Sequence, residues 1–152
     1  MMKNTGTEEA NIVEIYECVN FILNRTQSAV HLYFKERLAA FDVTPIQYSL
    51  LKCLWDSDMQ TPTMLAQALQ MDASTVTGLI ERLERKNLVA REYSVEDRRS
   101  ISIRLTSEGR GLQAGVEAAV QQANTEALRG LTEEQIAAFK RVCALIQENV
   151  RR

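Results

Sequence analysis

Histidine and cysteine are scarce in this chain, and their scarcity limits the kinds of site that it can build. The only histidine is His31, and the three cysteines, Cys18, Cys53 and Cys143, stand far apart with no CxxC pair. A zinc site within one chain usually needs several His or Cys ligands at short spacing. We therefore expect no metal site and no cofactor.

Sequence features of enzymes and of membrane or secreted proteins are also missing. The chain has six glycines, and it shows neither a glycine-rich phosphate loop nor a nucleophile–base set, so we expect no enzyme. The segment 1–11, MMKNTGTEEAN, lacks the apolar core of a signal peptide, and no run of 18 apolar residues occurs. We expect a cytoplasmic protein with reduced thiols and no membrane partner.

Composition favours a folded chain with one locally basic segment. The hydrophobic fraction is 45% and the charged fraction 25%, as in globular proteins, and 152 residues fit one domain. The net charge is −2, yet residues 82–104 hold seven Lys or Arg against four Asp or Glu. A basic stripe on a weakly acidic protein favours a specific, geometry-dependent contact with DNA over bulk coating.

The stretch 88–106, LVAREYSVEDRRSISIRLT, is the most informative part of the chain. Two β-prone runs flank a charged tip at 96–99, EDRR. In the second run Ile101, Ile103 and Leu105 alternate with polar residues, as a half-buried strand requires. A two-stranded ribbon that holds two adjacent arginines away from the protein body is suited to a narrow, negatively charged groove.

A helix and then a helix-turn-helix are expected before this ribbon. The sequence 44–47, TPIQ, predicts a helix start with a Thr N-cap and a capping box. A second Thr-Pro start follows at 61–62, and 70–72 forms a tight turn before a third helix, which starts at Asp72 or Ser74. Two short helices with a tight turn between them form a helix-turn-helix, and the ribbon makes it winged.

The third helix has two distinct faces. Its apolar stripe, which we expect in the core, consists of Val76, Leu79, Ile80 and Leu83. The opposite face is small, hydroxylated and basic, and includes Ser74, Thr77, Gly78, Glu81, Arg82 and Arg85.

Long helices are expected at both ends of the chain. Residues 10–40 predict one long helix, because apolar residues recur at steps of three and four. The chain returns to helix after Thr106, with a capping box at 132–135, TEEQ. Their apolar faces exceed what a small winged lobe covers, so a second copy of the chain is the simplest partner. We predict a mainly α fold with a small β-wing in a single chain, 1–152, which forms a homodimer: a winged helix-turn-helix lobe at 44–106 and a helical dimerisation region at 10–40 and 107–152.

On these residues the chain resembles the MarR family of transcription regulators, over roughly residues 12–150. The most specific match is the pattern D-x-R-x-x-x-hydrophobic-x-L-T-x-x-G at 97–109, with Ile103 at its hydrophobic position. Segments 42–48 and 75–83 are similar to the family's second-helix start and recognition helix. The resemblance implies a homodimer with a triangular helical dimerisation region and two winged lobes. It also implies binding to pseudo-palindromic DNA, commonly as a repressor released by a small molecule or by oxidation.

The resemblance also implies roles in DNA binding. Arg99 matches the arginine that enters the minor groove, and Asp97 matches the acid that orients it. Arg98 has no such match, and we expect it to contact phosphate only. A solvated Asp–Arg turn pair is the plain alternative. On the recognition helix the candidates for base and phosphate contacts are Ser74, Thr75, Thr77, Arg82 and Arg85. The alternative is that these residues form an ordinary exposed helix face.

A row of polar residues on the long helix expected over residues 10–40 is the candidate effector site. Asn20, Asn24 and His31 border its apolar stripe, which suits the crevice between dimerisation region and winged lobe where relatives hold aromatic acids or phenols. Arg25 and Ser28, about one turn away, are placed to pair with a carboxylate. The alternative is a solvated helix flank or a set of polar dimer contacts.

The sequence thus predicts a transcription regulator, a repressor that binds a pseudo-palindromic operator in double-stranded DNA as a homodimer. A small aromatic acid or phenol is the expected effector. One alternative keeps this fold and makes oxidation of Cys18 the signal. Against it, the family's reactive position aligns with Asn20, and the hydroxyl network that would activate a thiol is missing. Another alternative is a winged-helix assembly module without DNA affinity, against which Arg98 and Arg99 count.

Overall fold

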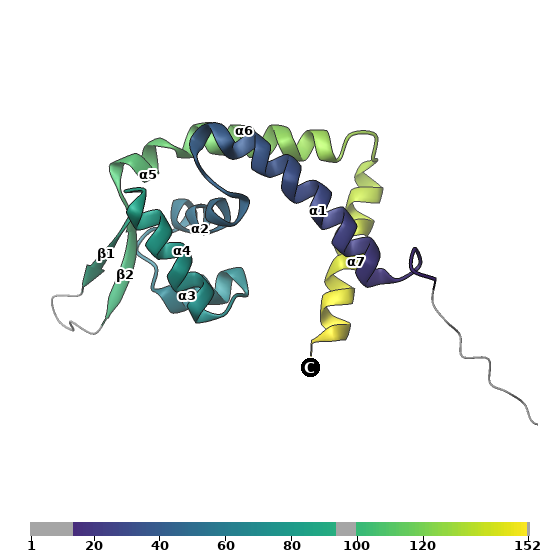
Figure 1. Ribbon diagram of the computed structural model, residues 1–152, viewed down its shortest axis with the longest axis horizontal. Helices are drawn as coiled ribbons and strands as arrows, with labels where there is room; N and C mark the ends of the chain where they lie inside the picture. Colours follow the sequence, from purple (N-terminus) through teal and green to yellow (C-terminus); the bar gives the residue numbers. More distant parts are fainter. Residues whose placement is uncertain (1–13, 94–99, 152) are drawn as a thin grey trace, which may run out of the picture.

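The structure, a computed structural model, describes residues 14–93 and 100–151. A lobe of short helices with a two-stranded sheet is joined to three longer helices (Figure 1). The long helices are α1 (Val19–Leu38), α6 (Gln113–Ala127) and α7 (Glu133–Val150), and α1 and α6 lie side by side. The lobe contains α2 (Pro45–Asp56), α3 (Pro62–Leu69), α4 (Ala73–Arg85), β1 (Val89–Tyr93) and β2 (Ile101–Leu105), and η1 (Ala39–Phe41) and α5 (Ser107–Gly111) connect the two parts. This architecture confirms the predicted mainly α fold with a small β-wing.

Local capping sets where most helices begin. Thr44 and Thr132 each form the complete predicted capping box, with Gln47 and Gln135 respectively. The Thr61 side chain accepts a hydrogen bond from the Met64 amide at the start of α3. These predicted helix starts are confirmed. They could be predicted because each depends only on residues within one helical turn. Of the two N-caps proposed for α4, the structure selects Asp72.

The prediction of one long helix over 10–40 is wrong at its start and in its last turn. Helix α1 begins at Val19, and residues 15–17 form a turn closed by a 2.8 Å hydrogen bond from the Glu17 amide to the Glu14 carbonyl. Cys18 is extended, with ψ of 117°, so the helical hydrogen bonds cannot continue through it. The Tyr16 ring instead packs edge-on against Phe21, with 5.8 Å between ring centroids. At the other end the chain tightens into η1.

The core of the lobe lies between α2, α3, α4 and the sheet. It is built mainly from leucine, isoleucine and valine, and the apolar stripe predicted for α4 is buried in it. The strands pair antiparallel, from Val89 with Leu105 to Tyr93 with Ile101. The Ile103 amide also donates to the Gln60 carbonyl at 2.7 Å, which attaches β2 to the segment between α2 and α3. The sheet is therefore an extension of the lobe with a fixed base.

The helices outside the lobe leave large apolar side chains uncovered in a single copy. Ile22 on α1 is 47% exposed, and Phe139 and Val142 on α7 are 53% and 54% exposed. Apolar faces of this size mark a surface for association. Within the described ranges no helix is long and apolar enough to span a membrane.

Candidate DNA-binding surface

Helix α4 has one buried apolar face and one exposed polar face. Val76, Leu79, Ile80 and Leu83 are at most 1% exposed, so the orientation of the helix in the lobe is fixed by packing. All five side chains predicted to contact DNA from this helix are exposed: Ser74, Thr75, Thr77, Arg82 and Arg85.

The hydroxyl groups at the start of α4 are tied to one carboxylate. The Ser74 hydroxyl donates to Asp72 Oδ1 at 2.5 Å, and the Thr75 hydroxyl donates to Oδ2 at 2.6 Å. The Thr75 amide donates to Oδ1 at 2.9 Å. These bonds, first those from the Ser74 and Thr75 side chains, hold the pKa of Asp72 well below its usual range. Asp72, which the sequence indicated only as a helix cap, therefore fixes how both hydroxyls are presented.

The rest of the exposed face of α4 is basic. The Thr77 hydroxyl donates to the Ala73 carbonyl at 2.8 Å, and Arg85 Nε donates to the Glu81 carbonyl at 3.4 Å. Arg82 and Arg85 form no ion pair with a carboxylate in the part of the chain that the structure describes. Their positive charge is thus available to a phosphate or a base edge.

The strands of the wing lie beside α4 (Figure 1). Arg91 on β1 forms an ion pair with Glu84 on α4, with 2.5 Å between Nη1 and Oε2. Arg104 on β2 pairs with Glu92 on β1 at 3.1 Å. The wing-tip candidates Asp97, Arg98 and Arg99 lie outside the described residues, so their predicted roles stay predictions.

The base of the wing is held by contacts that the sequence analysis missed. Asp58 Oδ1 accepts the Leu105 amide at 2.9 Å, and Asp58 Oδ2 accepts Arg110 Nη2 at 2.8 Å. Helical and strand periodicity carry no signal for these pairs, because the partners are 47 and 52 residues apart. The wing therefore starts from a base tied to α5 and to the segment that follows α2.

A helix-turn-helix followed directly by a two-stranded wing is also what comparison with known proteins finds. The sequence profile of the MarR family matches residues 43–101, from the approach to α2 to the first residue of β2. This match contains α2, α3 and α4, so the helix-turn-helix of the chain is of the MarR type.

Relatives of this chain include transcriptional regulators. It is 32% identical, over 89 residues, to the organic hydroperoxide resistance transcriptional regulator of Bacillus subtilis (strain 168). That alignment covers 59% of this chain and 60% of the relative, so the chain spans less than two thirds of the relative's length.

Solved structures of MarR family regulators match nearly the whole chain. The transcriptional repressor CouR, known from Rhodococcus jostii RHA1, was solved bound to a 23-mer DNA duplex. It has a TM-score of 0.81 and 27% identity, over 88% of this chain and 95% of that one. BpsR of Bordetella bronchiseptica, whose DNA binding is regulated by 6-hydroxynicotinic acid, has a TM-score of 0.81 and 24% identity, over 90% and 98%.

The effector candidates on α1 fall into two groups. Asn24, Arg25 and Ser28 line one shallow hollow of about 370 Å³ together with Phe21. Asn20 and His31 are exposed on the same helix but do not line it. Three of the five effector candidates are therefore brought together, with Arg25 as the cationic member.

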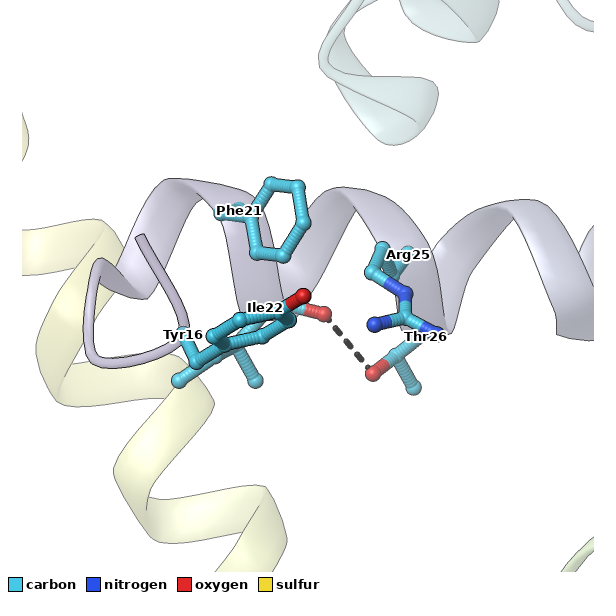
Figure 2. A pocket seen from close by; sticks show the side chains of 5 residues that line it. All are labelled: Tyr16, Phe21, Ile22, Arg25 and Thr26. Carbon is cyan, nitrogen blue, oxygen red and sulfur yellow. Dashed lines mark hydrogen bonds between the residues drawn. The ribbon is translucent and has the colours of Figure 1, made fainter. Parts of the chain in front are cut away.

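A second hollow of about 360 Å³ lies next to the first, and Arg25 and Phe21 line both. Figure 2 shows the Arg25 guanidinium turned toward the Tyr16 phenol, with the hydrogen bond from the Thr26 hydroxyl to the Ile22 carbonyl dashed. The Arg25 guanidinium carbon lies 5.7 Å from the Phe21 ring centroid. The lining side chains of both hollows come from α1 and the turn before it, not from the winged lobe.

The cysteines and acidic groups within the described ranges form no cluster that suits a metal ion. Among residues 14–93 and 100–151, no group of three or more His, Cys, Asp or Glu side chains is placed to hold a metal ion. Cys18, Cys53 and Cys143 are free and half-buried. Burial raises the pKa of the Cys53 thiol, and Cys53 packs against the lobe core.

Proposed function

We propose that this chain is a DNA-binding transcription repressor of the MarR family that acts as a homodimer on a pseudo-palindromic operator. The observation that carries the proposal is the exposed face of α4, where hydroxylated and basic side chains stand clear of the core beside a two-stranded wing. A helix of this kind fits the major groove, where Arg pairs with guanine and hydroxyl groups meet base edges and phosphates. The wing tip, with Arg99 oriented by Asp97, then enters the adjacent minor groove.

The uncovered apolar faces of α1 and α7 support the homodimer. A second copy would bury Ile22, Phe139 and Val142, which are about half exposed in one chain. Two-fold symmetry then presents two recognition helices to successive major grooves, about 34–36 Å apart or at a multiple of that spacing. On this proposal residues 44–106 bind DNA, and residues 10–40 and 107–152 form the dimerisation region.

A small aromatic acid or phenol is the effector that the α1 hollows fit best. Arg25 offers a bidentate partner for a carboxylate, and Phe21 and Tyr16 offer faces for a ring. Because only α1 and the turn before it line these hollows, a second wall has to come from the partner subunit or from movement of the lobe. The regulation of BpsR by 6-hydroxynicotinic acid provides a precedent for the ligand class.

Binding to DNA from the chain's own promoter tests this proposal. The purified protein is titrated at physiological ionic strength against that promoter and against arbitrary fragments of equal length, and its mass is measured by sedimentation equilibrium. We expect a dimer and a preference for the promoter of about a thousandfold or more. A monomer, or equal affinity for both DNAs, would refute it.

One observation favours a second candidate, in which oxidation is the signal. The relative described above is a hydroperoxide resistance regulator, and Cys18 is the N-cap of α1. This candidate predicts that an organic hydroperoxide releases the wild-type protein from its operator and leaves the Cys18→Ser variant bound. Release of both proteins, or of neither, would exclude it.

A further inference from the structure

An ion pair joins the recognition helix α4 directly to the first strand of the wing. Arg91 Nη1 lies 2.5 Å from Glu84 Oε2, and the Arg91 amide donates to Glu84 Oε1 at 3.3 Å. One carboxylate thus accepts hydrogen bonds from both the side chain and the backbone of the same residue. Both side chains are partly buried, at 26% exposed for Glu84 and 29% for Arg91, so water screens the pair less than a free surface pair.

Glu84 is placed against the local preference of its helix. It lies in the last turn of α4, where the helix dipole disfavours a negative charge. Arg82 and Arg85 occupy the same turn, as the dipole prefers. Because the helix itself disfavours a carboxylate at this position, the position of Glu84 indicates a role outside α4. Its contact outside α4 is Arg91.

The backbone between α4 and β1 is short and has a defined shape. The Leu88 amide donates to the Leu83 carbonyl at 3.0 Å and the Asn87 amide to the Glu84 carbonyl at 2.8 Å, which is a Schellman motif. Asn87 is left-handed, with φ of 56°. The Thr106 amide donates to the Leu88 carbonyl at 3.1 Å and its hydroxyl to the Asn87 carbonyl at 2.6 Å, so the motif and these bonds fix where the strand leaves the helix. Beyond this base, the outer part of the ribbon could still swing relative to α4 unless a further contact holds it.

Arg91 is well placed to prevent that swing. It is the middle residue of β1 and pairs with Ile103, the middle residue of β2. Ile103 is fully buried, and its amide donates to the Gln60 carbonyl. The central rung of the ribbon is therefore fixed on one strand by Glu84 and on the other by Gln60.

We propose that Glu84 is a positioning residue which, through Arg91, locks the wing to the recognition helix so that both meet DNA as one rigid unit. The inference rests on the proposed DNA-binding function for its purpose but not for its geometry. Glu84 itself points at the wing strand and not at the operator. Its loss should therefore act on DNA only through the wing.

A distance measurement without DNA tests the lock itself. Spin labels are placed at Glu81→Cys on α4 and Tyr93→Cys on β1, two exposed positions, with the three native cysteines replaced by alanine. Labelled chains are mixed with excess unlabelled chains so that one labelled copy is observed per dimer. We expect Glu84→Gln to broaden the distance distribution. The control Glu92→Gln, which removes the pair with Arg104 inside the ribbon, should leave it narrow. A Glu84→Gln distribution as narrow as that of the parent would overturn the proposal.

A double-mutant cycle on the operator tests the consequence for binding. Glu84→Gln should weaken operator binding by roughly fivefold, with the melting temperature followed to exclude unfolding. Once Arg99→Ala has removed the wing contact, adding Glu84→Gln should cause no further loss. Additive losses would overturn the lock, because they would mean that Glu84 acts independently of the wing. Failure of the proposed function is a separate result, since it would appear in the wild-type protein as equal affinity for promoter and arbitrary DNA.

Discussion

The backbone at Gly109 lies directly against the carbonyl of Leu88. A β-carbon at position 109 would lie 2.0 Å from the Leu88 oxygen and 3.3 Å from the Leu105 side chain. The Gly109 carbonyl also accepts a hydrogen bond from Trp55 Nε1 at 2.9 Å. Gly109 is thus the point at which α5 packs against both the wing base and α2.

Replacing Gly109 by alanine should therefore destabilise the lobe. The clash is with a backbone oxygen, which cannot rotate away, so the variant should lose about 1–3 kcal/mol of unfolding free energy in urea denaturation. Gly111→Ala is the matched control, because nothing lies within 4 Å of its β-carbon position in the same helix. That control should be unchanged or stabilised by about 0.5–1 kcal/mol. Equal stability of the two variants would contradict this account of Gly109.

Features set within one helical turn could be predicted from the sequence. The capping boxes at Thr44 and Thr132 and the buried stripe of α4 all depend on neighbouring residues. The glycine that ends the MarR pattern was recognised from the resemblance, but its reason, the contact with Leu88, appears only in the folded chain.

Features set by contacts distant in sequence could not be predicted. The start of α1 at Val19 is a local exception that apolar spacing does not reveal, because that spacing continues unbroken past the extended Cys18. The Asp58–Leu105 and Glu84–Arg91 contacts join separate elements, so no periodicity indicates them. The effector row was predicted from a helical flank, and the structure groups only Asn24, Arg25 and Ser28 in one hollow.

Arg99 should supply much of the wing's contribution to DNA binding. Arg99→Ala is expected to weaken operator binding by about 1–3 kcal/mol and to relax the preference for an A/T-rich flank, because a guanidinium favours the potential of a narrow minor groove. Fluorescence anisotropy with native and G/C-substituted flanks measures both effects. Arg129→Ala, an exposed cation at the end of α6, serves as the control and should bind as the parent does. Parental affinity of Arg99→Ala would refute the wing assignment.

Arg25 and His31 should differ in their effect on an aromatic effector. Arg25 lines both hollows on α1 and His31 lines neither. A panel of aromatic carboxylates and phenols is first screened for ligands that raise the melting temperature of the parent. For carboxylate hits, Arg25→Ala should abolish the shift and the release from DNA, whereas His31→Ala should retain both. Loss of both effects in His31→Ala alone would place the ligand elsewhere on α1.

A charge on the exposed apolar face of α7 should dissociate the dimer. Phe139→Glu would place a carboxylate at a position that a second copy buries, where an unpaired charge is costly. Arg141→Glu, about 200° away around the same helix, is the control and should leave the mass unchanged. Sedimentation equilibrium measures the mass of each variant and distinguishes monomer from dimer. A Phe139→Glu protein that remains dimeric at the same concentration would exclude this face of α7 from the interface.

Asp72 should make the stability of the lobe depend on pH in the acid range. Its hydrogen bonds with Ser74 and Thr75 hold its pKa in the folded chain below the ordinary value of about 3.9 for an unfolded Asp. Above that ordinary value the stabilisation is fully present, because the carboxylate is charged in both states. As the pH falls further, the unfolded chain takes up its proton first, so stability decreases and is lost once the folded group is also protonated.

Asp72→Asn isolates this effect, because an asparagine N-cap still accepts the Thr75 amide but carries no titrating charge. The pKa of Glu108 is also lowered, first by a backbone hydrogen bond, but Glu108 is present in both proteins and cancels in the comparison. Urea unfolding at pH values from about 7 to 2 should show a parental advantage that is constant at neutral pH and shrinks in acid. If the difference in unfolding free energy between the two proteins does not change with pH, the negative charge of Asp72 does not stabilise the lobe. The hydroxyl groups of Ser74 and Thr75 would then be free to turn toward DNA as donors.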